Sequence, residues 1–241
     1  MELADEALLY CDEALLALAK PPGLPVHATP DAGRDHLLAA VGRLLVRRGL
    51  AANGLGLPHR LDVGTSGLIV LGRQPEVTAQ LSALFAARRV QKTYLALTGR
   101  VEPLPESRLE VRNHLAANKD RKGVPVVPVR AGGDAAWTTL AVVRQGPRAV
   151  LWQATLHTGR RHQIRAHLAG LGMPIVGDLD YDTPIAASRP MLHAARLELR
   201  HPVTQVLLRL ESPLPADFQA VAARLGLSDL ANLAEILQSS A

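Results

Sequence analysis

Several features that would assign this protein to a special class are scarce in its sequence. One cysteine, Cys11, occurs among 241 residues, so no intrachain disulfide can form and a zinc site built on cysteines is excluded. No apolar run approaches the roughly 18 residues that span a bilayer. The N-terminal MELADEALLY carries acidic residues where a secretory signal peptide needs basic ones. These absences predict a cytoplasmic protein that does not bind a membrane.

Aromatic residues and cofactor motifs are also scarce. Aromatics make up 3% of the chain, which excludes a surface on which many bases stack but allows one ring against one base. The nine histidines contain no HExxH pair, and His157, His162 and His167 are five residues apart, a spacing that does not align them on one helical face. Neither a GxxxxGK[ST] loop nor a complete dinucleotide fingerprint is present. We therefore expect neither a metal nor a nucleotide cofactor.

The positive charge of the chain comes mainly from arginine. Lys and Arg number 27 against 22 Asp and Glu, which gives a net charge of +5, and lysine occurs at only four positions. Arginine is the better bidentate partner for phosphate. This composition is compatible with a nucleic-acid partner, although many basic enzymes bind none.

The hydrophobic pattern predicts an α+β protein, because most strands fall in adjacent pairs rather than in strand–helix–strand units. Strands are predicted over 7–10, 14–18, 68–71, 92–98, 137–143, 149–156, 192–199 and 206–210. Helices are predicted over 35–48, 75–87 and 161–171, with two weaker ones over 217–225 and 230–237. Residues 101–135, rich in Pro, Gly and charge, are predicted to form a long excursion.

The first motif that could carry chemistry is PHRLDVGTSG, residues 58–67, which precedes a short apolar strand. The glycines and hydroxyl residues place Asp62 on an irregular loop at the end of a sheet, where reactive groups are often held. The alternative is a simple turn, in which Asp62 accepts nearby amide N–H groups and Thr65 and Ser66 cap the bend.

The second motif is TGRRHQIRAHL, residues 158–168. On a helix, Arg161 and Arg165 are one turn apart and share a face, while Ile164 and Leu168 share another. We expect one face to pack and the other to project guanidinium groups, either as a solvated basic face or as a cleft wall.

The third motif is KTYLAL, residues 92–97, in a predicted strand. Tyr94 is one of three tyrosines. It belongs either to the core or to a site where it lies against a single base.

Taken together and in this order, the three motifs resemble those of the RluA-type pseudouridine synthases. Supporting stretches are Lys20-Pro21-Pro22-Gly23 with Val26-His27, Lys119-Asp120-Arg121, Val176-Gly177-Asp178 and Leu192-His193-Ala194. The resemblance covers about residues 8–215. It implies one catalytic domain over 1–241 with a C-terminal helical tail at 216–241. The implied fold is a mixed, largely antiparallel sheet flanked by helices and loops, with a central RNA-binding cleft.

The resemblance also implies a function, the isomerisation of uridine in ribosomal or transfer RNA to pseudouridine without cofactor or metal. We expect the protein to be a monomer. Asp62 matches the family's catalytic aspartate, acting as a nucleophile or as a base, and both roles need an ionised carboxylate. Arg165 matches the arginine that pairs with this carboxylate, and such a neighbour typically lowers a carboxyl pKa by ~1–3 units. Tyr94 matches the tyrosine that lies against the target base.

RNA contacts are implied by the same match. The target base must be flipped out of the RNA, and Arg60 could fill the vacated space or hold a flanking phosphate. The other candidate contacts are His59, Lys92, Arg160, Arg161 and His162, with Arg88 and Arg89 as further phosphate candidates.

Two departures from the family pattern and two alternatives stand beside this interpretation. The pattern starts near residue 8, which leaves no room for the N-terminal S4 domain of many relatives, and Tyr181-Asp182 replaces the usual Tyr-Gly. One alternative is an RNA-binding module of the same fold that has lost catalysis. The other is a serine hydrolase using Ser66, His59 and Asp62, which is disfavoured because residues 64–67 do not form a GxSxG elbow.

Overall fold

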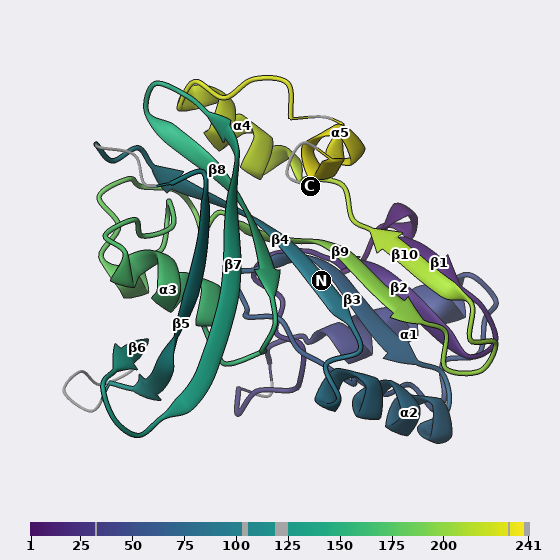
Figure 1. Cartoon of the computed structure of the whole chain (residues 1–241). Coiled ribbons are helices and arrows are strands. Elements are labelled where there is room, and N and C mark those ends of the chain that lie inside the picture. Colours follow the sequence, from purple (N-terminus) through teal and green to yellow (C-terminus); the bar gives the residue numbers. More distant parts are fainter. Residues whose placement is uncertain (32, 103–105, 119–124, 231, 239–241) are drawn as a thin grey trace. The chain divides into compact units, whose positions relative to one another are not determined.

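The computed structural model describes residues 1–31, 33–102, 106–118, 125–230 and 232–238 (Figure 1). Two compact units share the chain. The first comprises Met1–Gln91 with Ala194–Pro213, and the second comprises Lys92–His193 with Leu214–Ala241. The supporting stretch Lys119-Asp120-Arg121 lies outside the described residues. Both units combine antiparallel strand pairs with a few helices, which confirms the α+β prediction.

The first unit is built on the strand order β1-β2-β3-β9, with β10 paired to β9. The strands are β1 (Leu8–Cys11), β2 (Leu15–Lys20), β3 (Ser66–Gly72), β9 (Leu192–Arg200) and β10 (Leu207–Glu211). The short helix η1 (Asp5–Ala7) and the helices α1 (Leu37–Arg47) and α2 (Pro75–Ala86) accompany them. All seven residues of β3 are buried, as the unbroken apolar run predicted. The core of this unit includes Leu15, Ala17, Leu68, Val70, Val77, Leu81, Val90, Leu197 and Leu199.

Helix α1 forms because its apolar residues recur at helical spacing. Leu37, Val41 and Leu44 are fully buried on one side. The side chain of His36 accepts the backbone N–H of Ala39 at 3.4 Å and so caps the first turn. Gly49 ends the helix with a φ of +68°, a conformation that glycine adopts without strain. The predicted helix over 35–48 is therefore confirmed to within two residues.

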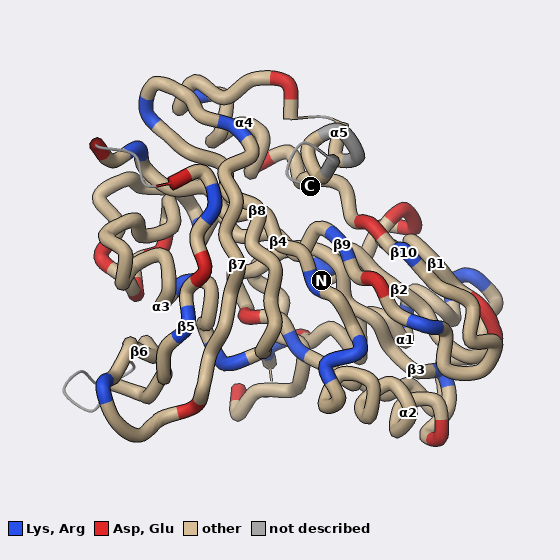
Figure 2. Tube along the Cα trace, viewed as in Figure 1, with Lys and Arg blue, Asp and Glu red and all other residues tan. Residues whose placement is uncertain are grey.

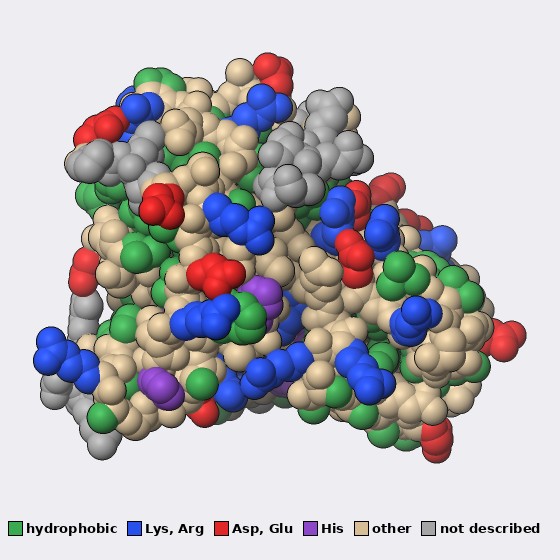
Figure 3. Space-filling view, viewed as in Figure 1, with side chains coloured by type: hydrophobic (Ala, Val, Ile, Leu, Met, Phe, Trp, Pro, Cys, Tyr) green, Lys and Arg blue, Asp and Glu red, His purple; other side chains and the backbone are tan. Residues whose placement is uncertain are grey.

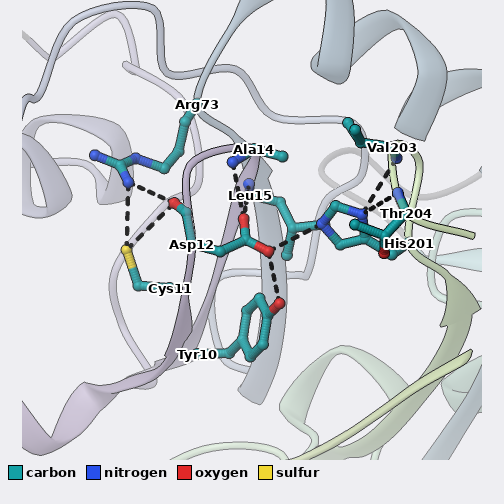
Figure 4. Close-up of polar contacts among 9 residues, drawn as sticks. All are labelled: Tyr10, Cys11, Asp12, Ala14, Leu15, Arg73, His201, Val203 and Thr204. Carbon is teal, nitrogen blue, oxygen red and sulfur yellow. Dashed lines mark hydrogen bonds and ion pairs between the residues drawn. The ribbon is translucent and has the colours of Figure 1, made fainter. Parts of the chain in front are cut away.

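A polar cluster ties the turn between β1 and β2 to the connection after β9 in the first unit (Figure 4). The Asp12 carboxylate accepts the backbone N–H groups of Ala14 and Leu15, each at 2.8 Å, and the Tyr10 hydroxyl at 2.6 Å. Its Oδ2 atom also lies 2.9 Å from Nε2 of His201. The hydrogen bond to Asp12 raises the pKa of Tyr10 to about 12.

The orientation of His201 follows from its second ring nitrogen. Nδ1 accepts the backbone N–H groups of Val203 at 3.2 Å and Thr204 at 3.0 Å. Because Nδ1 is an acceptor for both, Nε2 carries the proton and donates to Asp12. His201 is almost fully buried, so the cluster fixes the hairpin between β9 and β10.

The second unit follows the strand order β4-β8-β7-β5-β6. The strands are β4 (Gln91–Gly99), β5 (Arg108–Ala117), β6 (Val126–Val129), β7 (Asp134–Gln145) and β8 (Ala149–Leu156). The helices are α3 (Gln163–Gly170), η2 (Leu179–Tyr181), α4 (Ala216–Arg224) and α5 (Leu233–Gln238). Helix α3 packs against β5, β6 and β7. None of the helices in the described ranges is both long and apolar enough to cross a membrane.

The predicted excursion over residues 101–135 is wrong for two segments, because β5 and β6 lie within it. In β5 charged residues alternate with residues such as Leu109 and Val111, and only Leu115 is fully buried. Pairing with β7 over eight residue positions holds this strand in place. The strand therefore depends on its partner rather than on an apolar run of its own.

Candidate active site

Asp62 lies on irregular backbone four residues before β3, in the first unit. The carbonyl oxygens of the turn anchor it. That of Asp62 accepts the N–H of Thr65 at 3.1 Å, and that of Val63 accepts the N–H of Gly23 at 2.8 Å. The side chain of Asp62 is half-buried. The loop is therefore held in a defined shape while its carboxylate stays partly accessible.

A buried lysine secures the same turn. Lys20 is 1% exposed, and its Nζ donates to the carbonyl oxygens of Pro21 at 2.8 Å, Leu24 at 3.0 Å and Val63 at 3.2 Å. A buried ammonium group needs such partners to offset its lost hydration. The lysine thus links two motifs that are more than forty residues apart in sequence.

His59 fixes the other end of the loop. Its Nε2 accepts the backbone N–H of Val70 in β3 at 2.9 Å, and its ring stacks on Phe85 of α2 at 4.3 Å. Because Nε2 of His59 accepts this hydrogen bond, it cannot also accept a proton from Ser66, which argues against the serine hydrolase alternative. Arg60, the next residue, is exposed.

Gly67 explains why the loop motif and the stretch Leu192-His193-Ala194 occur together. Its φ is +111°, and a Cβ atom there would lie 2.3 Å from the carbonyl oxygen of Ala194. No other residue type fits so close an approach of two backbones. The Asp62 loop therefore enters β3 tightly packed against β9.

Tyr94 and Lys92 lie on one face of β4 in the second unit, because side chains two apart on a strand share a face. They pair with Ala154 and Leu156 of β8. Tyr94 is 8% exposed. Burial lowers the pKa of Lys92, and its Nζ would lie 2.9 Å from a Cβ placed on Gly159. The Lys92 ammonium group is therefore packed against the loop formed by residues 158–161.

Gln163 organises this loop. Its Oε1 accepts the Thr158 hydroxyl at 2.7 Å and the backbone N–H of Arg160 at 3.0 Å. Its Nε2 donates to the Trp137 carbonyl oxygen at 3.0 Å and to Thr138 Oγ1 at 2.8 Å. Four bonds satisfy a side chain that is 2% exposed. Gln163 is thus a positioning residue for residues 158–161.

Arg165 is the centre of a buried ion cluster. Its Nε and Nη2 donate to the two carboxylate oxygens of Asp178, both at 2.6 Å, and Nη2 also donates to Asp180 at 2.6 Å. Nη1 lies 3.0 Å from Nε2 of His162, and the guanidinium carbon lies 5.2 Å from the Tyr181 ring centre. Arg165 is 5% exposed and Asp178 is fully buried.

The expected shared face of Arg161 and Arg165 is wrong. Helix α3 begins at Gln163, because His162 has a φ of +53° and interrupts the helical path before it. Arg161 precedes the helix and is exposed, while Arg165 is buried. A solvated basic face is therefore excluded for Arg165. Its pairing with Asp62, which belongs to the other unit, stays a prediction.

The Tyr181-Asp182 departure has a structural explanation. Asp182 has a φ of +53°, the left-handed region in which glycine is most favoured and aspartate is tolerated. Tyr181 donates its hydroxyl to the Val126 carbonyl oxygen at 2.8 Å. The turn is therefore formed without the glycine.

The sequence reasoning missed three buried polar residues of the second unit. Asp178 belonged to a supporting stretch, but its contact with Arg165 had no sequence signal. His167 accepts or donates at 2.9 Å with Thr138 and at 3.0 Å with Asn113, and burial lowers its pKa to about 4, so its ring is neutral. Gln163 was noted only as part of a motif. In the described ranges, no three or more His, Cys, Asp and Glu residues gather as metal ligands would.

Comparisons with known proteins agree with these motifs. Residues 14–170, which include all three, match the RNA pseudouridylate synthase family. An uncharacterized RNA pseudouridine synthase of Chlorobaculum parvum is 34% identical, over 91% of this chain and 75% of its own length. The ribosomal large subunit pseudouridine synthase D of Nitrosomonas europaea is 33% identical, over 89% of this chain and 63% of its own.

A solved structure is similar over nearly the whole chain. Human RNA pseudouridylate synthase domain containing 4 is 29% identical and superposes with a TM-score of 0.74, over 93% of this chain and 95% of that one. A fold match of this extent confirms the pseudouridine synthase fold expected from the motifs. The chain therefore belongs to the RNA pseudouridylate synthase family, among its RluA-type members.

Proposed function

We propose that this protein isomerises particular uridines of RNA to pseudouridine, with Asp62 as the catalytic carboxylate. The observation that carries the proposal is the family match over residues 14–170, which spans the loop holding Asp62. The half-buried carboxylate on an anchored turn suits a reactive group on a rigid scaffold. Ribosomal RNA is the favoured substrate, because the Nitrosomonas relative is named for the large subunit, and transfer RNA is the second choice.

The reaction needs no co-reactant, because uridine and pseudouridine contain the same atoms. The bond between N1 of the base and C1′ of the ribose breaks, and the base turns over. A bond then forms between C5 of the base and the same C1′, and the proton on C5 is lost while N1 gains one. An ionised Asp62 would either attack the sugar or remove a sugar proton, and both routes need its negative charge.

Tyr94 and Arg165 are proposed partners of this carboxylate. We assign Tyr94 to the target base and Arg165 to the charge of Asp62, on the motif match. Arg165 is held by Asp178 and Asp180, so its guanidinium group is fixed before any RNA binds. Fixed charges of this kind stabilise a transition state more effectively than mobile ones.

The proposed RNA contacts are cationic side chains around the motifs. The base must be everted at a cost of about a few kcal/mol, and the exposed Arg60 is suited to fill the space it leaves. The remaining assignments are His59, Lys92, Arg160, Arg161 and His162. Of these, Arg160 and Arg161 are exposed, as phosphate contacts should be.

The substitution of Asp62 by Asn tests the catalytic assignment. The change is nearly isosteric, so RNA affinity should be retained while pseudouridine formation slows by about 100-fold or more. The measurement is pseudouridine mapping in RNA from cells with and without the protein, followed by rates on the mapped RNA. Asp229→Asn is the matched control, because this exposed residue has a φ of +59°, which Asn also tolerates.

Two results would contradict the proposal. Formation of pseudouridine by Asp62→Asn at the parental rate would show that Asp62 is not the catalyst. Tight RNA binding by the unaltered protein without conversion of any RNA would establish the inactive RNA-binding alternative. That alternative is disfavoured because Asp62, Tyr94 and Arg165 are all present.

We also propose that the protein acts in the cytoplasm as a monomer and uses no nucleotide cofactor. The absence of phosphate-binding loop motifs supports the last point. Light scattering during gel filtration would measure the mass in solution, and a dimer would contradict the monomer.

A further inference from the structure

Three side chains form a continuous stack across the sheet of the second unit. The guanidinium carbon of Arg112 lies 3.9 Å from the centre of the Trp137 ring. On the other side of Trp137, the ring of His157 stacks at 3.9 Å with an interplanar angle of 19°. Arg112 in β5 pairs directly with Trp137 in β7, and the backbone N–H of His157 donates to the Trp137 carbonyl oxygen. The stack therefore runs across three neighbouring segments.

This stack lies on the face of the sheet opposite Tyr94. Tyr94 pairs with Ala154, and Ala154 pairs with Leu140, so these three share one face. Side chains alternate along a strand. Because Trp137 is an odd number of residues from Leu140, and His157 is an odd number of residues from Ala154, both lie on the opposite face. Figure 1 shows α3 behind β5 and β7, and the view of the same side in Figure 3 shows basic and histidine side chains at the surface.

The stack is open to solvent at its Arg112 end. The Arg112 side chain is 61% exposed, although it forms an ion pair with Glu110 at 2.7 Å. Figure 2 shows basic and acidic residues together along β5. Burial lowers the pKa of His157, so the opposite end of the stack is a neutral ring. The stack thus presents one flat cationic surface, backed by two aromatic rings.

The loop that follows His157 connects the two faces of this sheet. Its exposed residues Arg160 and Arg161 are cationic, and Gly159 lies against the Lys92 ammonium group on the Tyr94 face. The hydroxyl of Thr158 accepts the backbone N–H of Trp137 at 2.9 Å, so the loop and the stack are joined. A strand of RNA in contact with Lys92 would pass Arg160 and Arg161 on its way around this loop, and Arg160 also lies 3.7 Å from the exposed carboxylate of Asp134.

We propose that the Arg112–Trp137–His157 stack is a second RNA contact, at which a nucleobase from a single-stranded stretch flanking the target uridine stacks on the Arg112 guanidinium group. This inference rests on the proposed function. Bases of single-stranded RNA stack readily on guanidinium planes and aromatic rings. Arg112 would also supply a positive charge to the backbone of the RNA. The alternative is a cross-strand stack that only stabilises the sheet.

Binding measurements distinguish the two roles. We would measure the affinity of Asp62→Asn protein, in which turnover is expected to be slowed, for a mixed-sequence single-stranded RNA of about 16 nucleotides. Arg112→Ala in this background should weaken binding about 5- to 150-fold, the loss expected for one stacked base. Arg112→Lys keeps the charge but not the plane, so it should show most of the same loss.

Arg108→Ala is the matched control. Arg108 is exposed on the same strand and the same face, but it pairs with Ala141 and not with a ring. Its removal deletes the same charge without a stacking plane. Equal affinities of Arg112→Lys and the parent, or equal losses in Arg108→Ala and Arg112→Ala, would overturn the stacking proposal.

Tryptophan fluorescence gives a second readout at the stack itself. The chain has two tryptophans, and Trp152 is fully buried, so acrylamide should quench only Trp137. Bound RNA should protect Trp137 from acrylamide, and Arg112→Ala should reduce this protection. Trp137→Phe keeps a ring in the stack and should remove the quenchable signal. Unchanged quenching of Trp137 at saturating RNA would overturn the proposal.

The activity of Arg112→Lys separates this inference from the proposed function. With Asp62 intact, the variant should have a raised KM and an unchanged kcat, because the contact lies on the face of the sheet opposite Tyr94. If the unaltered protein makes pseudouridine and the variant has the parental KM, the second contact fails while the function stands. If the unaltered protein makes none, the proposed function itself fails.

Discussion

At the scale of single residues, Arg165 has a structural role that its motif match does not imply. Its guanidinium group joins α3 to the segment containing Asp178 and Asp180. Asp178 is fully buried, and a buried carboxylate without its cation is costly. A loss of activity in an Arg165 variant therefore has two possible causes, instability of the second unit and a changed environment for Asp62.

Replacing Arg165 by Ala should lower the free energy of unfolding by about 3–5 kcal/mol, because Asp178 would be left buried and unpaired. Urea denaturation followed by circular dichroism measures this. Arg161→Ala is the control, since that side chain is exposed and its loss should change stability by about 0.5 kcal/mol or less. Equal urea midpoints for Arg165→Ala and the parent would show that the ion cluster contributes nothing to folding.

The residues of the site differ in how far the sequence could place them. Asp62 was correctly expected on an irregular loop before a strand, since the glycines and hydroxyl residues around it are turn formers. Arg161 was misplaced because helical spacing was extended back through His162, whose positive φ has no signature in the sequence. The partners of Arg165 could not be predicted, because they lie 13 and 15 residues away in an irregular segment.

At the scale of elements, the pattern of apolar residues was sufficient to predict a segment wherever one or both of its faces are buried. The run in β3 and the stripe in α1 are examples, and both were predicted within two residues. Strand β5 was missed because its residues alternate between charge and partial burial, and its stability comes from pairing with β7. The hydrogen bond between Asp12 and His201 could also not be predicted from the sequence, because 189 residues separate the two.

The Asp12 cluster should make the first unit sensitive to acid. Burial raises the pKa of the Asp12 carboxyl, but hydrogen bonds from Tyr10, Leu15 and Ala14 and the His201 ring outweigh it, so the pKa lies below its usual value. A carboxyl with a lowered pKa stabilises the folded state above its unfolded pKa of about 3.9, and this contribution is lost as pH falls through the folded pKa.

Asp12→Asn should therefore be less stable than the parent by about 1–3 kcal/mol at neutral pH, and by less as the pH falls below about 4. Urea midpoints of both proteins, measured from pH 7 to pH 3, test this. The other carboxyl groups titrate in both proteins, so their effect on stability cancels in the difference between the two proteins. A difference that stays constant over this range would show that the charge of Asp12 is not what stabilises the turn.

At the scale of the whole molecule, the motif residues are divided between the two units. Asp62 and Arg60 belong to the first unit, and Tyr94, Lys92 and Arg165 to the second. No local pattern connects residues so distant in sequence. Only the order of the motifs and their resemblance to one family indicated that they act together, and the family match over 14–170 confirms that family.

The net charge of +5 should make RNA binding depend strongly on salt. Each phosphate contacted on a single strand contributes about −0.7 to the slope of log affinity against log salt concentration. Contacts from Arg60, Lys92, Arg112, Arg160 and Arg161 together would give a slope near −3.5. Binding of single-stranded RNA across a range of potassium chloride concentrations measures this slope, and a slope near zero would exclude phosphate contacts by these side chains.

The slope also separates the two kinds of contact proposed for these arginines. Arg161→Ala should remove about 0.7 from its magnitude, because a phosphate partner is lost. Arg112→Lys keeps its charge, so it should lower the affinity at every salt concentration and leave the slope unchanged, since stacking releases no counterions. An unchanged affinity in Arg112→Lys, together with a slope made shallower by about 0.7 in Arg112→Ala, would instead mean that the guanidinium group serves only the phosphate backbone.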